Sequence, residues 1–482
     1  MDAALEKRIK RQVIGKQHRF LAVSPLGFEQ TLVKELELIS ADPSAELPHV
    51  TGDGKVEFTA KITEAWRIVA YSRIANRVLM EVANFKAENF RELEKKASEI
   101  PFELYLATNH QPLTTIHVTC KHSRLYHSDA IAERLQKIIE GGSLPLAPSR
   151  RENGPSVLQT KDERKSAKAA SRLDYATPSA GTPRNAPPQN LYVNFLDDRC
   201  TIWIDLAGEE LYKRGHERFV NEAPLKETIA DAMLFEAFDA TAQATNNVTP
   251  DPVPGPPYTL LDLMSGSGTF SLEAAYIANK LIPGVCRDFA LKHHPAFKEA
   301  TWNFITRSVT LSETKGPVKS CKAFATIEKI LTSDISERAI EIIKHNVESS
   351  PLAKIAPNAV VPQLKDFFSY TAKEIAEACG DSSPIMLLNP PYGKRLDFDA
   401  PRLYTKIGQK LTELANSLAT FNKRLTVAVL APKDDTRNGA KYTCTTNLLR
   451  ECPALSPEHN PSAKIIETSH GGFSLNAIIA IV

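Results

Sequence analysis

The sequence has none of the features that mark a membrane, secreted or zinc-ribbon protein. Its seven cysteines include no C-x-x-C pair, which argues against a zinc ribbon or a disulfide scaffold and favours buried, reduced thiols. No apolar run approaches the roughly 18 residues that span a bilayer. The basic residues near the N-terminus are not followed by the apolar segment of a secretory signal. We therefore expect a cytoplasmic protein.

A dominant charge of one sign is also lacking. The 59 basic residues nearly balance the 57 acidic ones, which leaves a formal net charge of +2. This balance excludes a protein that coats nucleic acid uniformly, although it allows local basic patches. With 482 residues, 42% of them hydrophobic, the chain has material for about three domains.

The N-terminal half alternates strand and helix patterns around one segment that has neither. Residues 1–16 are charged and are expected to be frayed or helical. Short β patterns follow at 20–23, 56–58, 77–82, 113–120, 191–196 and 201–206, the last two as a hairpin. Residues 141–189 carry seven prolines and eight basic residues with almost no apolar periodicity. We expect a disordered, mildly basic insertion there.

From residue 222 onward the pattern is α/β. Strand patterns occur at 258–264, 329–333, 360–364, 385–388, 425–430 and 475–482, with helical patterns between most of them. Such alternation predicts a parallel, doubly wound sheet. The last strand follows Gly471-Gly472 and is expected to form a hairpin at the edge of this sheet.

The first chemistry-bearing segment runs from Asp262 to Thr269. A buried strand ends in this aspartate and turns through Gly266 and Gly268 into a helix. Glycines let backbone N–H groups approach a ligand, and the helix N-terminus adds partial positive charge. Two glycines alone are a weak signal, because many turns between a strand and a helix need glycine.

Two further acids follow the next strands. Asp334 ends one of them and could accept hydrogen bonds from ribose hydroxyls, and Asp366 could meet an adenine amine. Either acid could instead be a helix N-cap. Asp334 lies 72 residues beyond Asp262, whereas about 20 is usual, so an insertion at about 283–324 must be looped out of the fold.

The most specific segment is Asn389-Pro390-Pro391-Tyr392, at the carboxyl end of a buried strand. Open α/β sheets bind ligands at that edge. An exocyclic amine attacks poorly because its lone pair is delocalised into the ring. The Asn389 side chain and the Pro390 carbonyl could hold its two N–H groups, while Tyr392 stacks on a base swung out of its helix. A proline-rich structural turn with a packing tyrosine is the alternative.

Together these segments resemble class I S-adenosylmethionine-dependent methyltransferases that modify exocyclic amines. Residues 212–216 and 222–227 narrow the resemblance to THUMP-domain guanine-N2 RNA methyltransferases. Residues 20–27, 56–58, 73–79 and 123–129 resemble the N-terminal domains of the same family. The most similar group is the bacterial large-subunit (23S) ribosomal RNA guanine-N2 methyltransferases. Ser265 stands where the family often has cysteine, and His216 where it often has an aromatic residue.

The resemblance implies a domain order. A charged tail at 1–16 would precede a ferredoxin-like subdomain at 17–85 and an α+β THUMP RNA-binding domain at 86–207, which would contain the 141–189 insertion. A Rossmann-like class I methyltransferase domain would occupy 208–482. The family implies S-adenosylmethionine as the cofactor, no metal, no membrane, and a monomer.

Site residues follow from the same resemblance. Asn389, Pro390, Pro391 and Tyr392 would hold the target base. The cofactor would contact Asp262, Ser265, Gly266, Ser267, Gly268, Thr269, Asp334, Asp366 and Asn389. Candidate RNA contacts are Lys121, Arg124, Lys213, Arg214, Arg218, Lys394 and Arg395, any of which could instead simply face water.

The leading prediction is methyl transfer to a guanine N2 amine in 23S ribosomal RNA. Transfer RNA is a second possible substrate, because THUMP domains also bind it. A third hypothesis is a DNA adenine-N6 or cytosine-N4 methyltransferase, since the tetrapeptide at 389–392 could orient any exocyclic amine. A catalytically silent RNA-binding or ribosome-assembly factor is the fourth.

Overall fold

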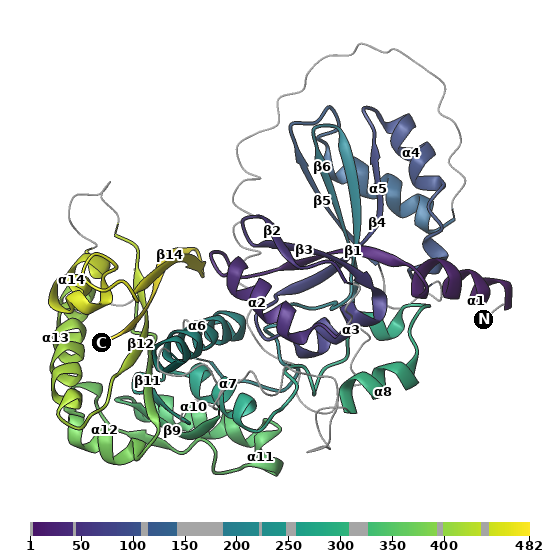
Figure 1. Cartoon of the computed structure of the whole chain (residues 1–482). Coiled ribbons are helices and arrows are strands. Elements are labelled where there is room, and N and C mark those ends of the chain that lie inside the picture. Colours follow the sequence, from purple (N-terminus) through teal and green to yellow (C-terminus); the bar gives the residue numbers. More distant parts are fainter. Residues whose placement is uncertain are drawn as a thin grey trace.

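The computed structural model describes residues 3–41, 45–107, 114–141, 187–220, 224–246, 257–307, 326–392, 399–434 and 443–482. These residues form two parts, each built on a seven-stranded sheet (Figure 1). Within the described ranges, no helix is both long enough and apolar enough to cross a membrane. The expected insertion at 141–189 lies almost entirely outside them.

The N-terminal sheet has the strand order β2-β3-β1-β4-β7-β6-β5. Its strands are β1 (Gln17–Val23), β2 (His49–Gly52), β3 (Lys55–Lys61), β4 (Arg77–Lys86), β5 (Thr114–Lys121), β6 (Gln189–Leu196) and β7 (Arg199–Asp205). All neighbours are antiparallel except β5 and β6. The helices of this part are α2 (Glu29–Ile39), α3 (Ile62–Tyr71), α4 (Phe90–Ser98) and α5 (Ser128–Ile139).

Strand β4 joins the two halves of this sheet. Its first residues pair with β1, with Phe20 opposite Met80, and its later residues pair with β7, with Lys86 opposite Arg199. The expected boundary at residues 85 and 86 therefore falls at the end of a strand that both halves share. Asp197 and Asp198 turn β6 into β7 with positive φ at both residues, which suits the right-handed twist of a hairpin.

The described N-terminal residues are helical, which is one of the two forms expected, but they pack on the fold and do not form a free tail. Helix α1 (Ala3–Ile9) continues into a π-helical turn, Lys10–Ile14. Ile9 and Val13 are only 2% and 1% exposed, because one apolar stripe of this charged segment faces the core.

The C-terminal sheet has the order β10-β9-β8-β11-β12-β14-β13. Its strands are β8 (Tyr258–Asp262), β9 (Ile327–Asp334), β10 (Pro362–Leu364), β11 (Ser383–Leu388), β12 (Thr426–Pro432), β13 (Lys464–His470) and β14 (Phe473–Ile481). Strands β8 to β12 are parallel, whereas β14 runs antiparallel between β12 and β13. The doubly wound prediction is confirmed. The last strand forms the expected hairpin at the edge of the sheet, with β13 as the outermost strand.

Helices cover the C-terminal sheet (Figure 1). They are α6 (Glu227–Asn246), α7 (Thr269–Ala278), α10 (Glu337–Glu348), α11 (Leu352–Ile355), α12 (Ala372–Cys379), α13 (Ala400–Ala419) and α14 (Cys444–Glu451). Helix α8 (Glu299–Arg307), in the insertion after α7, packs instead against α3 of the N-terminal part. The central strands β8, β11 and β12 are rich in apolar residues because both faces of the sheet are covered there; every residue of β8 is buried, and all but one of β11 and of β12. Their order brings the carboxyl ends of β8, β9 and β11 together at one edge.

Candidate active site

The turn after β8 is a backbone cradle. Gly266 and Gly268 have φ of +54° and +76°, the left-handed region that glycine adopts without strain. The Gly266 N–H donates to Asp334 Oδ2 at 2.8 Å, and Ser265 donates to the Ser333 carbonyl through its N–H (3.1 Å) and its Oγ (2.9 Å). These bonds tie the turn to the end of β9. A Cβ on Gly266 would have no atom within 4 Å, so this side of the turn is open to a ligand.

Asp262 anchors the helix that follows the cradle. Its Oδ2 accepts from the N–H (3.1 Å) and the Oγ (2.6 Å) of Ser271 in α7. Its Oδ1 is buried without a partner. Burial, with a smaller contribution from the Asp334 charge, raises the pKa of Asp262 to about 7. Asp262 therefore stabilises the cradle through its hydrogen bonds to α7.

The sequence allowed two roles for Asp334, accepting hydrogen bonds from a ribose or capping a helix. One oxygen accepts from the cradle at Gly266, and the other accepts from the Ser336 N–H at 2.9 Å. Ser336, not Asp334, is the N-cap of α10, because its side chain accepts from Ala339. The adjacent Ser333 Oγ is buried without a partner. Asp334 thus lies beside the cradle, and its contact with a ribose stays a prediction.

Asp366 is a local cap in this structure. Its side chain accepts from the Phe368 N–H at 3.0 Å and begins the 3₁₀ turn Phe367–Ser369. That is the structural role the sequence left open. A contact with adenine stays a prediction for this residue.

Asn389 follows β11, the strand next to β8. Its Oδ1 is buried and has no hydrogen-bond partner. A buried amide oxygen without a partner is costly, and such exceptions are frequent where a ligand completes the bonding. Pro390 is buried and Pro391 exposed, so the turn is anchored at one end.

Tyr392 does not present its ring as the stacking prediction requires. It is only 7% exposed, and its hydroxyl lies 3.1 Å from His470 Nδ1. The ring packs edge-on against Phe473, with centroids 6.1 Å apart. Burial raises its pKa to about 12. The β13–β14 hairpin therefore covers Tyr392, and neither His470 nor Phe473 was singled out from the sequence.

Residues 214–219, which we call the strap, run beside the cradle. Phe219 donates its N–H to Asn346 Oδ1 (2.7 Å) and accepts from Asn346 Nδ2 (2.9 Å). The same Nδ2 reaches the Ser267 carbonyl at 3.2 Å. Asn346 is fully buried on α10 and so fastens the strap to the cradle. The sequence did carry a signal: a polar residue within the apolar stripe of Ile342, Ile343 and Val347.

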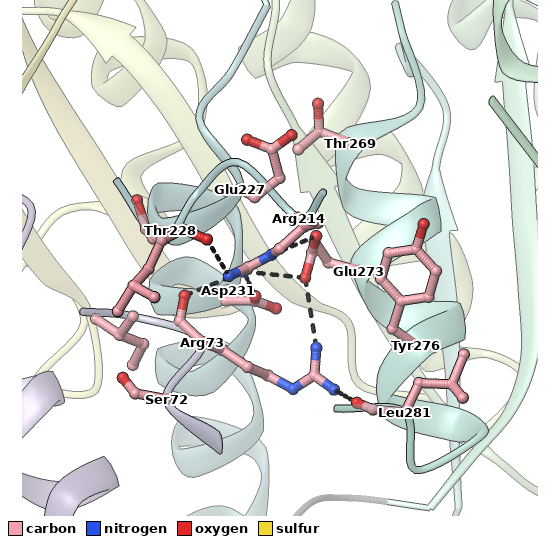
Figure 2. Close-up of polar contacts among 12 residues, drawn as sticks. Ser72, Arg73, Arg214, Glu227, Thr228, Asp231, Thr269, Glu273, Tyr276 and Leu281 are labelled. Atoms are coloured by element: carbon pink, nitrogen blue, oxygen red, sulfur yellow. Dashed lines mark hydrogen bonds and ion pairs between the residues drawn. The ribbon is translucent and has the colours of Figure 1, made fainter. Parts of the chain in front are cut away.

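The prediction that Arg214 contacts RNA is wrong. Its side chain is 3% exposed and pairs with Asp231 at 2.7 Å and with Glu273 at 3.2 Å. Arg73, from the N-terminal part, reaches the same glutamate at 3.4 Å (Figure 2). Burial alone would raise the pKa of Glu273, but Arg214, a hydrogen bond with Asp231 and the Arg73 charge together lower it to about 2. These four residues form a buried charge network between the two parts.

Arg218 is also enclosed. It pairs with Glu227, donates to Thr269 Oγ1 and has a side chain that is 11% exposed, so its placement on an RNA-facing surface is corrected too. Three other candidates are exposed: Lys121, Arg124 and Lys213. Arg124 pairs with Glu88, and Lys213 with Glu209. Lys394 and Arg395 lie outside the described residues. No group of acids, histidines or cysteines within the described ranges could hold a metal ion.

Comparison with known proteins agrees with this architecture. Residues 214–440 match the RMKL-like methyltransferase domain, and residues 19–79 match the RlmL ferredoxin-like domain. The ribosomal RNA large subunit methyltransferase K/L of Allochromatium vinosum is 27% identical over 399 residues, covering 82% of this chain and 46% of that protein. The chain thus spans a little under half the length of this curated relative.

Solved structures show the same fold. A possible methylase from Clostridium difficile 630 has a TM-score of 0.63 at 20% identity, covering 96% of this chain and 98% of its own. SMU.472, a putative methyltransferase solved with S-adenosylhomocysteine, has a TM-score of 0.62 at 21% identity with the same coverage. Residues 214–440 therefore form an RMKL-like methyltransferase domain, and residues 19–79 ahead of it form an RlmL ferredoxin-like domain.

Proposed function

We propose that this protein transfers a methyl group from S-adenosylmethionine to the exocyclic N2 amine of a guanine in RNA, most specifically in 23S ribosomal RNA. The observation that carries the proposal is the buried, unpartnered Oδ1 of Asn389 at the carboxyl end of β11, on the strand beside the cradle. A substrate amine that enters this site gives up its hydrogen bonds to water, so it needs an acceptor on the protein in the position of Asn389 Oδ1.

The cradle suits this cofactor. Its methionine part would lie against residues 265–269, where Gly266 leaves open space, and its ribose near Asp334. The buried, unpartnered Ser333 Oγ offers a further polar group at this edge. SMU.472, which shares the fold, was solved with the demethylated product of this cofactor.

Alignment supplies most of the catalysis. S-adenosylmethionine provides an electrophilic methyl group, so the protein needs mainly to orient the amine toward it. Asn389 Oδ1 and the Pro390 carbonyl would accept the two amine N–H bonds and direct the lone pair. Tyr392 would stack on the base only after the hairpin at His470 and Phe473 moves aside.

The proposal that the substrate is RNA rests on the names of the relatives and on the N-terminal part of the chain. The relatives of matching sequence are named as large-subunit ribosomal RNA methyltransferases. We propose that 17–85 is the ferredoxin-like subdomain and that 86–207 is a THUMP domain that binds RNA by phosphate contacts and shape. The exposed Lys121, Arg124 and Lys213 would face the RNA, in a cytoplasmic monomer.

The test measures N2-methylguanosine by mass spectrometry in RNA from cells that lack the protein. Loss from 23S ribosomal RNA, restored by the purified protein with S-adenosylmethionine, is the expected result. Loss confined to transfer RNA would keep the chemistry but replace the substrate. Modification of DNA alone, or of no nucleic acid, would overturn the proposal.

The variant Asn389→Ala tests the mechanism. It removes the amide acceptor without touching the cradle, so methyl transfer should fall at least about 100-fold while the Kd for S-adenosylhomocysteine changes little. Isothermal titration and single-turnover transfer measure the two effects separately. Equal loss of transfer and binding would show that Asn389 is structural.

A further inference from the structure

Arg218 occupies an unusual position beside the cradle. Its Nη2 donates to Thr269 Oγ1, and Thr269 is the first residue of α7. Its Nη1 pairs with Glu227 at the start of α6. The guanidinium group therefore lies at the N-terminus of a ten-residue helix, directly against the turn assigned to the cofactor.

The charge balance at this point is incomplete. A helix N-terminus carries partial positive charge and favours an anion, not a cation. Arg218 adds a full positive charge there, with Glu227 as its ion-pair partner, whereas the nearby Arg214 pairs with two carboxylates. The Nε of Arg218 is buried and has no hydrogen-bond partner. Burial lowers the pKa of Arg218, so the protonated form would gain from an additional anion.

The backbone around Arg218 is held firmly. Glu217 accepts from Ser349 Oγ at 2.9 Å, and Phe219 is bonded on both sides to the buried Asn346. Asn346 also bonds the cradle residue Ser267. Asn346 therefore ties the backbone next to Arg218 to the cradle. Thr269 and Glu227 hold the guanidinium group itself.

We propose that Arg218 binds the α-carboxylate of the methionine part of S-adenosylmethionine. A planar guanidinium group matches a carboxylate through paired N–H donors, and both the unpartnered Nε and the α7 N-terminus favour an anion at this place. The inference rests on the proposed function, because it assigns one contact within that cofactor site. Arg218 is thus a cofactor-binding residue, not an RNA contact.

The test combines a protein change with a ligand change. The ligands are S-adenosylhomocysteine and its decarboxylated analogue, the 3-aminopropyl thioether of adenosine, which keeps the amine and lacks only the carboxylate. The proteins are the full chain and the variants Arg218→Met and Arg218→Lys. Arg424→Met is the control. Arg424 is exposed and lies just before the amino end of β12, whereas the proposed site lies at the carboxyl ends of the parallel strands.

Isothermal titration gives the preference of each protein for the carboxylated ligand. The unaltered chain and Arg424→Met should prefer S-adenosylhomocysteine by roughly 10- to 100-fold, as a charge-assisted contact predicts. Arg218→Met should lose this preference, and Arg218→Lys should keep part of it. Thermal denaturation without ligand shows whether each variant is folded.

The outcomes separate the inference from the function on which it rests. If Arg218→Met weakens both ligands equally and the preference survives, Arg218 only supports the strap and the inference is wrong. If the unaltered chain binds neither ligand, the proposed cofactor itself is wrong. If Arg218→Met does not fold, Arg218→Lys decides, since an unchanged preference in that folded variant would also contradict the fork-shaped contact.

Discussion

Gly266 and Gly268 share a left-handed backbone but have different surroundings. A Cβ on Gly268 would lie 2.9 Å from Ile343 Cγ1 on α10, whereas a Cβ on Gly266 would meet no atom within 4 Å. The second glycine is therefore required for packing of α10 against the cradle. The first keeps the surface open where the cofactor is proposed to bind.

We expect Gly268→Ala to destabilise the protein more than Gly266→Ala. Left-handed strain costs each about 1–2 kcal/mol, and overpacking adds roughly 1–3 kcal/mol for Gly268→Ala. Gly266→Ala should instead weaken S-adenosylhomocysteine binding, because its methyl group projects toward the ligand. Thermal denaturation without ligand and titration with ligand measure the two effects. Equal destabilisation with unchanged affinity would contradict these roles.

Asp262 should make stability depend on pH. Its pKa in the folded chain is about 7, above the usual value for an aspartate, so the folded state holds a proton that the unfolded chain has released. The free energy of unfolding from this group then falls as the pH rises from about 4 to 7, by about 1.4 kcal/mol per unit at most. Above the folded pKa both states are ionised and the trend ends.

The matched variant is Asp262→Asn, which can still accept a hydrogen bond from Ser271 but does not titrate. Its unfolding temperature relative to the unaltered chain should increase between pH 4.5 and 7 and then level off, measured without ligand. A difference that stays constant across this range would show that Asp262 is ionised in the folded protein.

For Arg214, the sequence alone could not predict whether the side chain is buried. It lies in a polar run with Lys213, and such runs usually face solvent. Its burial depends on Asp231 and Glu273, which are 17 and 59 residues away in the chain. The cradle and the Asn389 turn could be found because their chemistry is local in sequence, whereas a buried ion pair depends on tertiary contacts.

At the scale of elements, the apolar interior strands were predictable, whereas two of the four edge strands in the described residues were not. Strands β8 and β11 are short apolar runs between turns, a strong pattern. Strands β2 and β13 were missed, and β2 has no buried residue and β13 only one; the edges β5 and β10 were predicted although neither has a buried residue. The segment Lys464–His470 carries charged and hydroxyl residues on its exposed face, which hides its β character.

The strap is an element without regular structure, and Asn346 is expected to hold it in place. Asn346→Ala removes its bonds to Phe219 and Ser267, so the Phe219 amide should exchange hydrogen at least about tenfold faster, a loss of about 1.4 kcal/mol in local opening. Hydrogen-exchange mass spectrometry of residues 214–220 is the measurement. Asn279→Ala, which removes a side-chain bond at the end of α7, is the control and should leave this segment unchanged.

At the scale of the whole molecule, the two parts are joined by polar contacts between helices. Thr31 on α2 donates to Glu236 on α6 at 2.7 Å, and Lys34 pairs with Asp239 at 2.7 Å. The insertion after α7 also packs against the N-terminal part, since Tyr71 on α3 donates to the Ile305 carbonyl on α8 at 2.8 Å. The insertion expected at 283–324 thus contributes residues to the interface between the parts.

The charge network around Glu273 crosses this interface (Figure 2). Arg73 enters from the N-terminal part, and its carbonyl accepts from Arg214 Nη2 at 3.1 Å. Glu273 lies on α7, one turn beyond Thr269 in the cradle. A change at this carboxylate should therefore affect both the stability of the molecule and the cohesion of its two parts.

Glu273→Gln leaves two buried guanidinium groups with Asp231 as their remaining carboxylate in the network. Breaking a buried ion pair in this way typically costs about 3–5 kcal/mol. Calorimetry should show one cooperative transition for the unaltered chain and a lower, broader or divided transition for the variant, because the two sheets no longer share the network. Glu377→Gln removes an exposed pair with Lys373 and should change the free energy of unfolding by no more than about 0.5 kcal/mol. If Glu273→Gln behaves like this surface control, the network does not couple the two parts.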